Sequence, residues 1–197
     1  MGLVRVLIQR ANVHQSLAQP TEALESLDRA ASLLDPEDSP FLFLCTVTTR
    51  VLCLCDLDRA DEAWDLLHRH LHRYQESDDP WVRVSVKDLE GRVLLGLGCH
   101  DEAEEAFAAC RDGALELGRD YDAALAGLDL ALVYLEQGRT ADLRELAADL
   151  VPTFQARGVD REALAALRLF QQAVQAEELT RSALAEIRQR IRRDVPE

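Results

Sequence analysis

The sequence contains little lysine, few aromatic residues and no long apolar run. Lys87 is the single lysine among 22 basic residues, and aromatic residues make up 5% of the chain. This use of arginine is typical of a genome rich in G and C, so we expect a bacterial source. No apolar run reaches the roughly 18 residues of a membrane-spanning helix. Arg5 and Arg10 interrupt the first apolar run, so a secretory signal is not expected either.

Basic residues are also scarce relative to acidic ones. The 197 residues include 36 acidic and 22 basic side chains, which gives a formal net charge of -14. A negative field of this size repels phosphate backbones and anionic lipid headgroups. Neither nucleic acid nor a membrane is therefore expected as a direct ligand. The 48% of hydrophobic residues is ample for a folded core, and the length favours one domain spanning residues 1–197.

The cysteines indicate a reducing compartment rather than a disulfide framework. They are odd in number and lie within apolar stretches, as reduced cysteines do when they act as small hydrophobic residues. We therefore expect a cytoplasmic protein. Two of them are only two positions apart on an expected helix and so point in nearly opposite directions, and no base stands at a defined spacing from any of them. No cysteine nucleophile is predicted at Cys45, Cys53, Cys55, Cys99 or Cys110.

The chain repeats itself with a period of 40 residues. TEALESLDRAASLL, DEAWDLLHRHLHRY and DEAEEAFAACRDGALEL begin at Thr21, Asp61 and Asp101, and each has apolar residues at helical spacing. No alternating β-branched run interrupts this pattern. The period predicts an all-α chain of helix pairs in which each unit buries its apolar face against its neighbours. The expected units are 4–37, 40–78, 80–118, 120–158 and 160–193.

Turn residues divide each expected unit into two helices. Gly98 and Gly138 stand where a first helix should end, because glycine readily adopts the left-handed conformation that terminates helices. We assign Gly96 to the same turn, although GLGCHD also contains part of a dinucleotide-binding fingerprint. Asp101 and Thr140 are expected to cap the second helices that follow.

The third unit, GRVLLGLGCHDEAEEAFAACRDG, resembles a tetratricopeptide repeat (TPR). Gly91 and Ala103 match the small residues of the family's close helix contacts, Phe107 matches its large core residue, and Cys110 stands where a small residue is usual. The 40-residue period is similar to the long-repeat versions found in sensor and scaffold segments of bacterial regulators. The resemblance implies a right-handed helical-hairpin solenoid of about five repeats, with the first helices lining a concave groove.

The resemblance also implies where a partner would bind. The groove of such repeats usually receives a peptide or helix of a partner protein. A carboxylate clamp of the chaperone type is not expected, because only Asn12 matches its residue set. In our register the groove has an apolar floor with polar flanks, formed by Asn12, Leu52, Asp88, Arg92, Leu95, Leu125, Leu128, Leu132, Leu135, Leu169 and Gln172.

The expected function is a protein–protein interaction or scaffold module without catalytic activity or a cofactor. Its partner is a protein or peptide, another domain of the same polypeptide, or a second copy in a homodimer. Met1 and Gly2 lead almost directly into the first helix. The expectation therefore includes the case in which this module is the terminal part of a larger signalling protein. The alternative is a ligand-responsive sensor domain that binds a small molecule or signalling peptide. The groove leucines themselves either receive the partner or are covered by the fifth unit.

Two further clusters have a chemical and a structural interpretation. His68 and His72 share a helix face and could hold a metal ion, but two ligands do not complete a site, so a solvated face with His70 partly buried is favoured. The C-terminal arginines could bind phosphate. The favoured interpretation is a soluble cap on the last helix, where positive charge complements the helix dipole, formed by Arg188, Arg190, Arg192 and Arg193.

Overall fold

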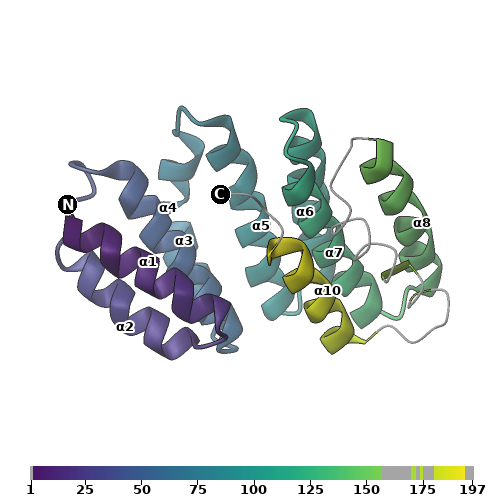
Figure 1. Cartoon of the computed structure of the whole chain (residues 1–197), viewed down its shortest axis with the longest axis horizontal. Coiled ribbons are helices and arrows are strands. Elements are labelled where there is room, and N and C mark those ends of the chain that lie inside the picture. The colour runs from purple at the N-terminus through teal and green to yellow at the C-terminus, as the bar shows by residue number, and fades with distance from the viewer. Residues whose placement is uncertain (1, 157–169, 172–173, 175–179, 194–197) are drawn as a thin grey trace. The chain divides into compact units, whose positions relative to one another are not determined.

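The computed structural model describes residues 2–156, 170, 171, 174 and 180–193, and the ordered elements among them are all helices. This confirms the all-α prediction, and none of the described helices is long and apolar enough to cross a membrane. The helices labelled in Figure 1 are α1 (Gly2–Ser16), α2 (Pro20–Ala31), α3 (Pro40–Asp56), α4 (Ala60–Gln75), α5 (Pro80–Gly96), α6 (His100–Glu116), α7 (Asp120–Glu136), α8 (Thr140–Ala156) and α10 (Arg181–Arg193).

The helices from α2 to α8 begin at intervals of 20 residues, so that two helices fill each 40-residue period. Proline occupies the first position of α2, α3 and α5, where its missing amide hydrogen costs nothing and its fixed φ favours a helix. The prediction of two helices per repeat is therefore confirmed over the first four repeats.

The turn between the two helices of each of these repeats contains a residue in the left-handed conformation. Gly98 and Gly138 have φ of 77° and 67°, which confirms that they terminate first helices. Ala18 and Asp58 occupy the same position in the two earlier repeats, with φ of 55° and 56°. The turn geometry is thus set by the repeat, and glycine is present in only some copies.

Three expectations about these turns are corrected by the structure. Gly96 is the last residue of α5, and a Cβ atom built on it would lie 2.9 Å from the Cβ of Ala60, so its smallness serves helix packing. Asp101 and Thr140 lie inside α6 and α8 rather than before them, because these helices begin at His100 and Thr140. The Asp101 carboxylate instead accepts a hydrogen bond from Gln137 at 3.3 Å.

The chain forms two compact units, residues 1–99 and 100–197, each with its own core. In the first unit, consecutive helices from α1 to α5 pack on one another. Val51, Leu67 and Val93 are fully buried at its centre beside Tyr74. The Tyr74 hydroxyl is 2.9 Å from the Thr48 hydroxyl, so its polar end is paired inside the core.

The second unit is built around α7, which packs against α6, α8 and α10. Small residues on both helices bring α6 and α7 close together, and Ala103, Phe107 and Ala131 are fully buried there. The small buried residue predicted at Ala103 is thereby found in the core. Gly127 admits the side chain of Leu150 from α8, which lies where a Cβ atom would otherwise be. The C-terminal helix α10 lies alongside α7 in Figure 1.

Candidate functional site

The candidate site is one face of α7, on which α10 is docked. Helical spacing places six residues on this stripe, four leucines and two acids. We call it the α7 face, and it consists of Leu125, Leu128, Asp129, Leu132, Leu135 and Glu136.

Two ion pairs connect α10 to the α7 face. Arg188 Nη2 lies 2.8 Å from Asp129 Oδ2, and Arg181 pairs with Glu136 through its Nη2. The two arginines are seven residues apart, and so are the two acids. Since the higher-numbered arginine meets the lower-numbered acid, the helices run antiparallel, with matching charge spacings of about 10.5 Å.

Apolar side chains of α10 lie on the same stripe as its two paired arginines. Leu184 and Ile187 are buried, with 3% and 6% exposed. The favoured interpretation of the C-terminal arginines as a solvated cap is therefore corrected for Arg188. Its side chain is only 16% exposed and is paired with a carboxylate, so it does not simply solubilise the end of the helix.

The four groove leucines predicted on α7 are on this face, but they are not freely exposed. Leu128 is buried, with 1% exposed, so its side chain is not on an open surface. Leu125, Leu132 and Leu135 are half-buried. Sequence reasoning missed the two acids on the same face, Asp129 and Glu136. The signal was present, because Asp129 interrupts the apolar sequence LAGLDLALVYL.

The first unit holds the remaining described groove residues on α1, α3 and α5. Asn12 is exposed and its Oδ1 accepts a hydrogen bond from the Thr49 hydroxyl at 3.3 Å. Leu52 is half-buried against the core of the first unit. Arg92 Nε donates to Asp88 Oδ2 at 2.8 Å, one turn away on the same helix.

Leu95 is also half-buried, near the end of α5. The structure thus places two polar pairs and two half-buried leucines on the first helices of this unit. The predicted groove residues Leu169 and Gln172 lie outside the described residues.

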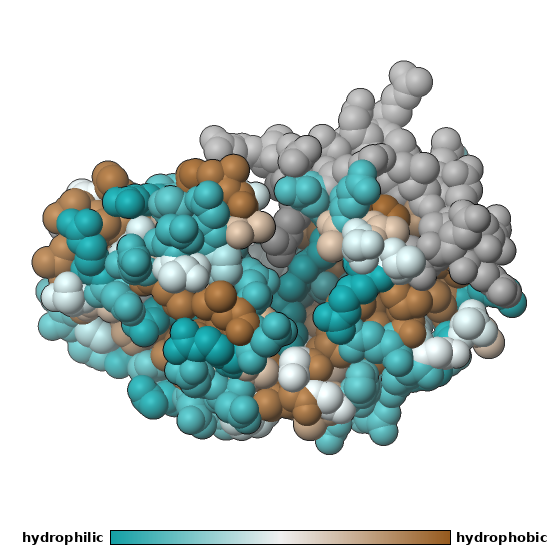
Figure 2. Space-filling view, turned by 90° about the horizontal axis from the view of Figure 1, so that it is seen from below, coloured by the Kyte–Doolittle hydropathy of each residue, from teal (hydrophilic) through white to brown (hydrophobic). Residues whose placement is uncertain are grey.

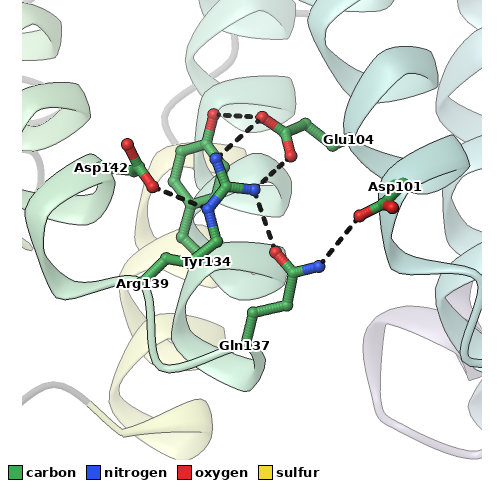
Figure 3. A network of polar contacts seen from close by, with 6 residues as sticks. All are labelled: Asp101, Glu104, Tyr134, Gln137, Arg139 and Asp142. Carbon is green, nitrogen blue, oxygen red and sulfur yellow. Dashed lines mark hydrogen bonds and ion pairs between the residues drawn. The ribbon is translucent and has the colours of Figure 1, made fainter.

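A polar network joins α6, α7 and α8 near the ends of the α7 face (Figure 3). Arg139 lies between Glu104 and Asp142, donating to Asp142 Oδ2 at 2.7 Å and to both oxygens of Glu104. The Tyr134 hydroxyl donates to Glu104 at 2.9 Å, and the Arg139 guanidinium lies 4.4 Å from the centre of its ring. Burial, with the hydrogen bond to Glu104, raises the pKa of Tyr134 to about 12.

This network holds Glu104 in place between neighbouring elements. Glu104 is half-buried and accepts hydrogen bonds from Tyr134 of α7 and from Arg139 in the turn between α7 and α8, whereas its neighbour Glu105 is exposed. The arrangement is a set of satisfied hydrogen bonds and ion pairs that holds three helices in register. It contains no unpaired base or nucleophile among the residues drawn in Figure 3.

The histidines and cysteines considered for metal or thiol chemistry make other contacts in the structure. No group of three or more metal-ligating side chains occurs among the described residues. His68 packs on Trp64 with ring centres 4.0 Å apart, and His70 meets Phe43 edge-on at 5.0 Å. Burial raises the pKa of the Cys53 thiol to about 11, which keeps the thiol protonated at neutral pH.

Helix α1 carries a stripe of exposed apolar side chains. Val6 and Val13 have exposed fractions of 63% and 55% and point to the same side of the helix as Leu3. The positions 40 residues after the two valines, Thr46 and Cys53, are buried. The face of the molecule seen in Figure 2 likewise has several separate apolar patches among hydrophilic side chains.

The first unit also contains an open pocket of about 480 Å³. It lies where α3 and α5 begin and α4 ends. Phe41, which is 65% exposed, contributes an aromatic wall. Acidic residues predominate among the polar side chains of the lining, which consists of Pro40, Phe41, Leu44, Arg73, Glu76, Ser77, Asp78, Asp79 and Val82.

Comparison with known proteins assigns the fold. No protein-family model matches the chain, and no curated protein matches it either. Two solved structures of the Podosopora anserina protein described as a kinesin light chain with nearly identical TPR-like repeats are similar to it. One has a TM-score of 0.65 and 16% identity, and the other has 0.64 and 18%. Each comparison covers 96% of this chain and 93% of the other. The chain therefore has the all-α fold of TPR-like helical repeats.

Proposed function

We propose that this protein is an interaction or scaffold module that binds a helix or peptide of a partner protein on the faces of its first helices. The observation that carries the proposal is the docking of α10 on the α7 face. That face already holds an amphipathic helix through two ion pairs and buried apolar side chains. Helix binding by an apolar face with charged edges is a recurring mode of peptide recognition.

The first unit supports the same function with a different surface chemistry. Its first helices present the exposed Asn12, the half-buried Leu52 and the Asp88–Arg92 pair. Apolar side chains with polar groups beside them provide both contact area and orientation for a bound segment. We therefore extend the proposed function to a non-enzymatic scaffold whose partners include other domains of the same polypeptide.

This function is tested by selecting peptides that bind the full chain from a displayed library of helical and extended sequences. Selected peptides are measured by fluorescence polarisation against the chain and against its Leu52→Glu and Leu132→Glu variants. We expect at least one of the two variants to lose about tenfold in affinity, which corresponds to one interface residue of ordinary importance. The matched control is Leu33→Glu, because Leu33 is 55% exposed and lies in the segment between α2 and α3 rather than on a first helix. Equal affinity for all four proteins would contradict the proposal.

The pocket beside Phe41 favours a second candidate function, that of a ligand-responsive sensor domain. Its volume of about 480 Å³ lies in the range of small-molecule sites, and its acidic lining with one aromatic wall suits a cationic amine. A thermal-shift screen with aromatic and aliphatic amines tests this. A ligand that binds there raises the melting temperature of the chain, and Phe41→Ala abolishes that shift.

A further inference from the structure

The charge of α10 is opposite to that of the unit on which it docks. It contains five arginines and one glutamate, whereas residues 100–156 contain thirteen acidic and four basic side chains. Complementary charge steers association and fixes the register of an interface. The α7 face is therefore matched to a basic amphipathic helix, and α10 is a helix of this kind.

Among the described residues, few side chains hold α10 in place. Leu184 and Ile187 are its described buried apolar side chains. Arg181 is 72% exposed, so water and salt screen its pairing with Glu136. The Nε atom of Arg188 is buried and has no hydrogen-bond partner among the described residues. A helix held in this way can be exchanged for one that fills the same face more completely.

We propose that α10 is an intrachain occupant of a site that receives a basic amphipathic helix of a partner protein. This rests on the proposed function and specifies its partner class. The partner helix carries two arginines seven residues apart with two apolar residues between them on the same stripe. It binds Asp129 and Glu136 in place of Arg188 and Arg181, and α10 must leave the α7 face before it binds.

The experiment uses the full chain and a fluorescent peptide with the sequence of residues 180–193 as the probe. In the wild-type chain the attached α10 competes at a high effective concentration, so the probe binds weakly. The Arg188→Glu variant removes this competition by placing a carboxylate against Asp129. We expect its affinity for the probe to be at least about tenfold higher than that of the wild-type chain, and to fall as salt is added.

Matched controls separate release of α10 from general effects of charge and folding. Gln189→Glu adds an acid at an exposed position outside the docking stripe, and its affinity should equal that of the wild-type chain. The Arg181→Glu/Arg188→Glu form of the probe should not bind. If circular dichroism shows that Arg188→Glu has not folded, the Arg181→Glu variant takes its place, because Arg181 is largely exposed.

The outcomes distinguish this proposal from the broader function. If a folded variant binds the probe no better than the wild-type chain does, α10 is a fixed part of the fold and the proposal is wrong. A wild-type dimer that becomes a monomer on Arg188→Glu would assign α10 to a second copy and would also overturn the proposal. The effect of Leu52→Glu on the affinity for library-selected peptides does not depend on α10. That measurement therefore tests the general binding function separately.

Discussion

Asp129 occupies in α7 the position that Leu89 occupies in α5, forty residues earlier, and it is buried to the same extent. The exposed fractions are 4% for the acid and 3% for the leucine. An ionised carboxylate at a core position costs free energy unless it is paired. Arg188 provides that pairing at 2.8 Å, so the same repeat position that packs a leucine in the first unit holds a charge in the second.

The pairing predicts a strong energetic coupling between these two residues. Asp129→Leu alone leaves Arg188 buried without its carboxylate, and we expect it to lower the free energy of unfolding by about 3 kcal/mol. Adding Arg188→Leu should restore stability to within about 1 kcal/mol of the wild-type chain, because an apolar pair can replace a buried ion pair. A double-mutant cycle from urea unfolding measures the coupling. Additive effects of the two substitutions would show that the residues act independently.

The left-handed turn residues predict opposite effects for two reciprocal substitutions. Ala18→Gly should raise the free energy of unfolding by about 0.5 kcal/mol, since relief of left-handed strain exceeds the entropy that glycine adds to the unfolded chain. Gly98→Ala should lower it by about 1 kcal/mol for the same reason. Ala109→Gly in the middle of α6 is the control and should destabilise by about 1 kcal/mol. Destabilisation by Ala18→Gly would mean that the alanine is unstrained.

Gly96 and Gly127 both contact a neighbouring helix, but they should differ in how well they tolerate an added methyl group. Gly96→Ala places a Cβ atom 2.9 Å from the Cβ of Ala60, and neither atom can move without its backbone. We expect a loss of about 1–3 kcal/mol, as for other overpacked sites. Gly127→Ala meets the end of the Leu150 side chain, which can rotate, so its loss should be smaller. Ala60→Gly in the Gly96→Ala background should recover stability, and no recovery would place the strain elsewhere.

The network around Arg139 predicts the titration of Tyr134. Its pKa of about 12 lies above the ordinary value of 10, because burial and the hydrogen bond to Glu104 both favour the neutral phenol. The contribution of this raised pKa to stability is present below pH 10 and is lost as the pH rises from 10 to about 12. Tyrosine-selective ¹³C NMR should show Tyr134 still protonated near pH 11. Glu104→Gln should lower its pKa without restoring the ordinary value, and an unchanged pKa would exclude a role for the carboxylate.

The helices were predictable from the sequence because their signals are local. The apolar spacing within DEAEEAFAACRDGALEL, the left-handed glycines and the constant period all lie within one or two repeats. Ala103 and Phe107 were thereby placed in the core, and the structure finds both fully buried. Cap positions were less accurate, since Asp101 is suited to a cap by type but lies one residue inside the helix.

The candidate site was only partly predictable because it depends on pairs far apart in the chain. Asp129 and Arg188 are separated by 59 residues, and no local spacing indicates that α10 would lie on α7. Helical spacing alone places the leucines of the α7 face on one stripe, but the burial of Leu128 depends on tertiary packing. The division into five units within one domain and the full set of groove residues stay predictions.

The exposed stripe of α1 has a consequence for the order in which the repeats open. In a helical-repeat protein each hairpin is stabilised by its own packing and by interfaces with its neighbours. Val6 and Val13 leave one such interface surface in water, whereas their counterparts in α5, Val86 and Val93, are buried. Among the described residues the α1–α2 hairpin packs on α3, and we expect it to have a lower free energy of local opening than the helices whose corresponding valines are buried. We therefore expect amide hydrogen exchange to begin at this hairpin, with α1 exchanging before α3 and α5.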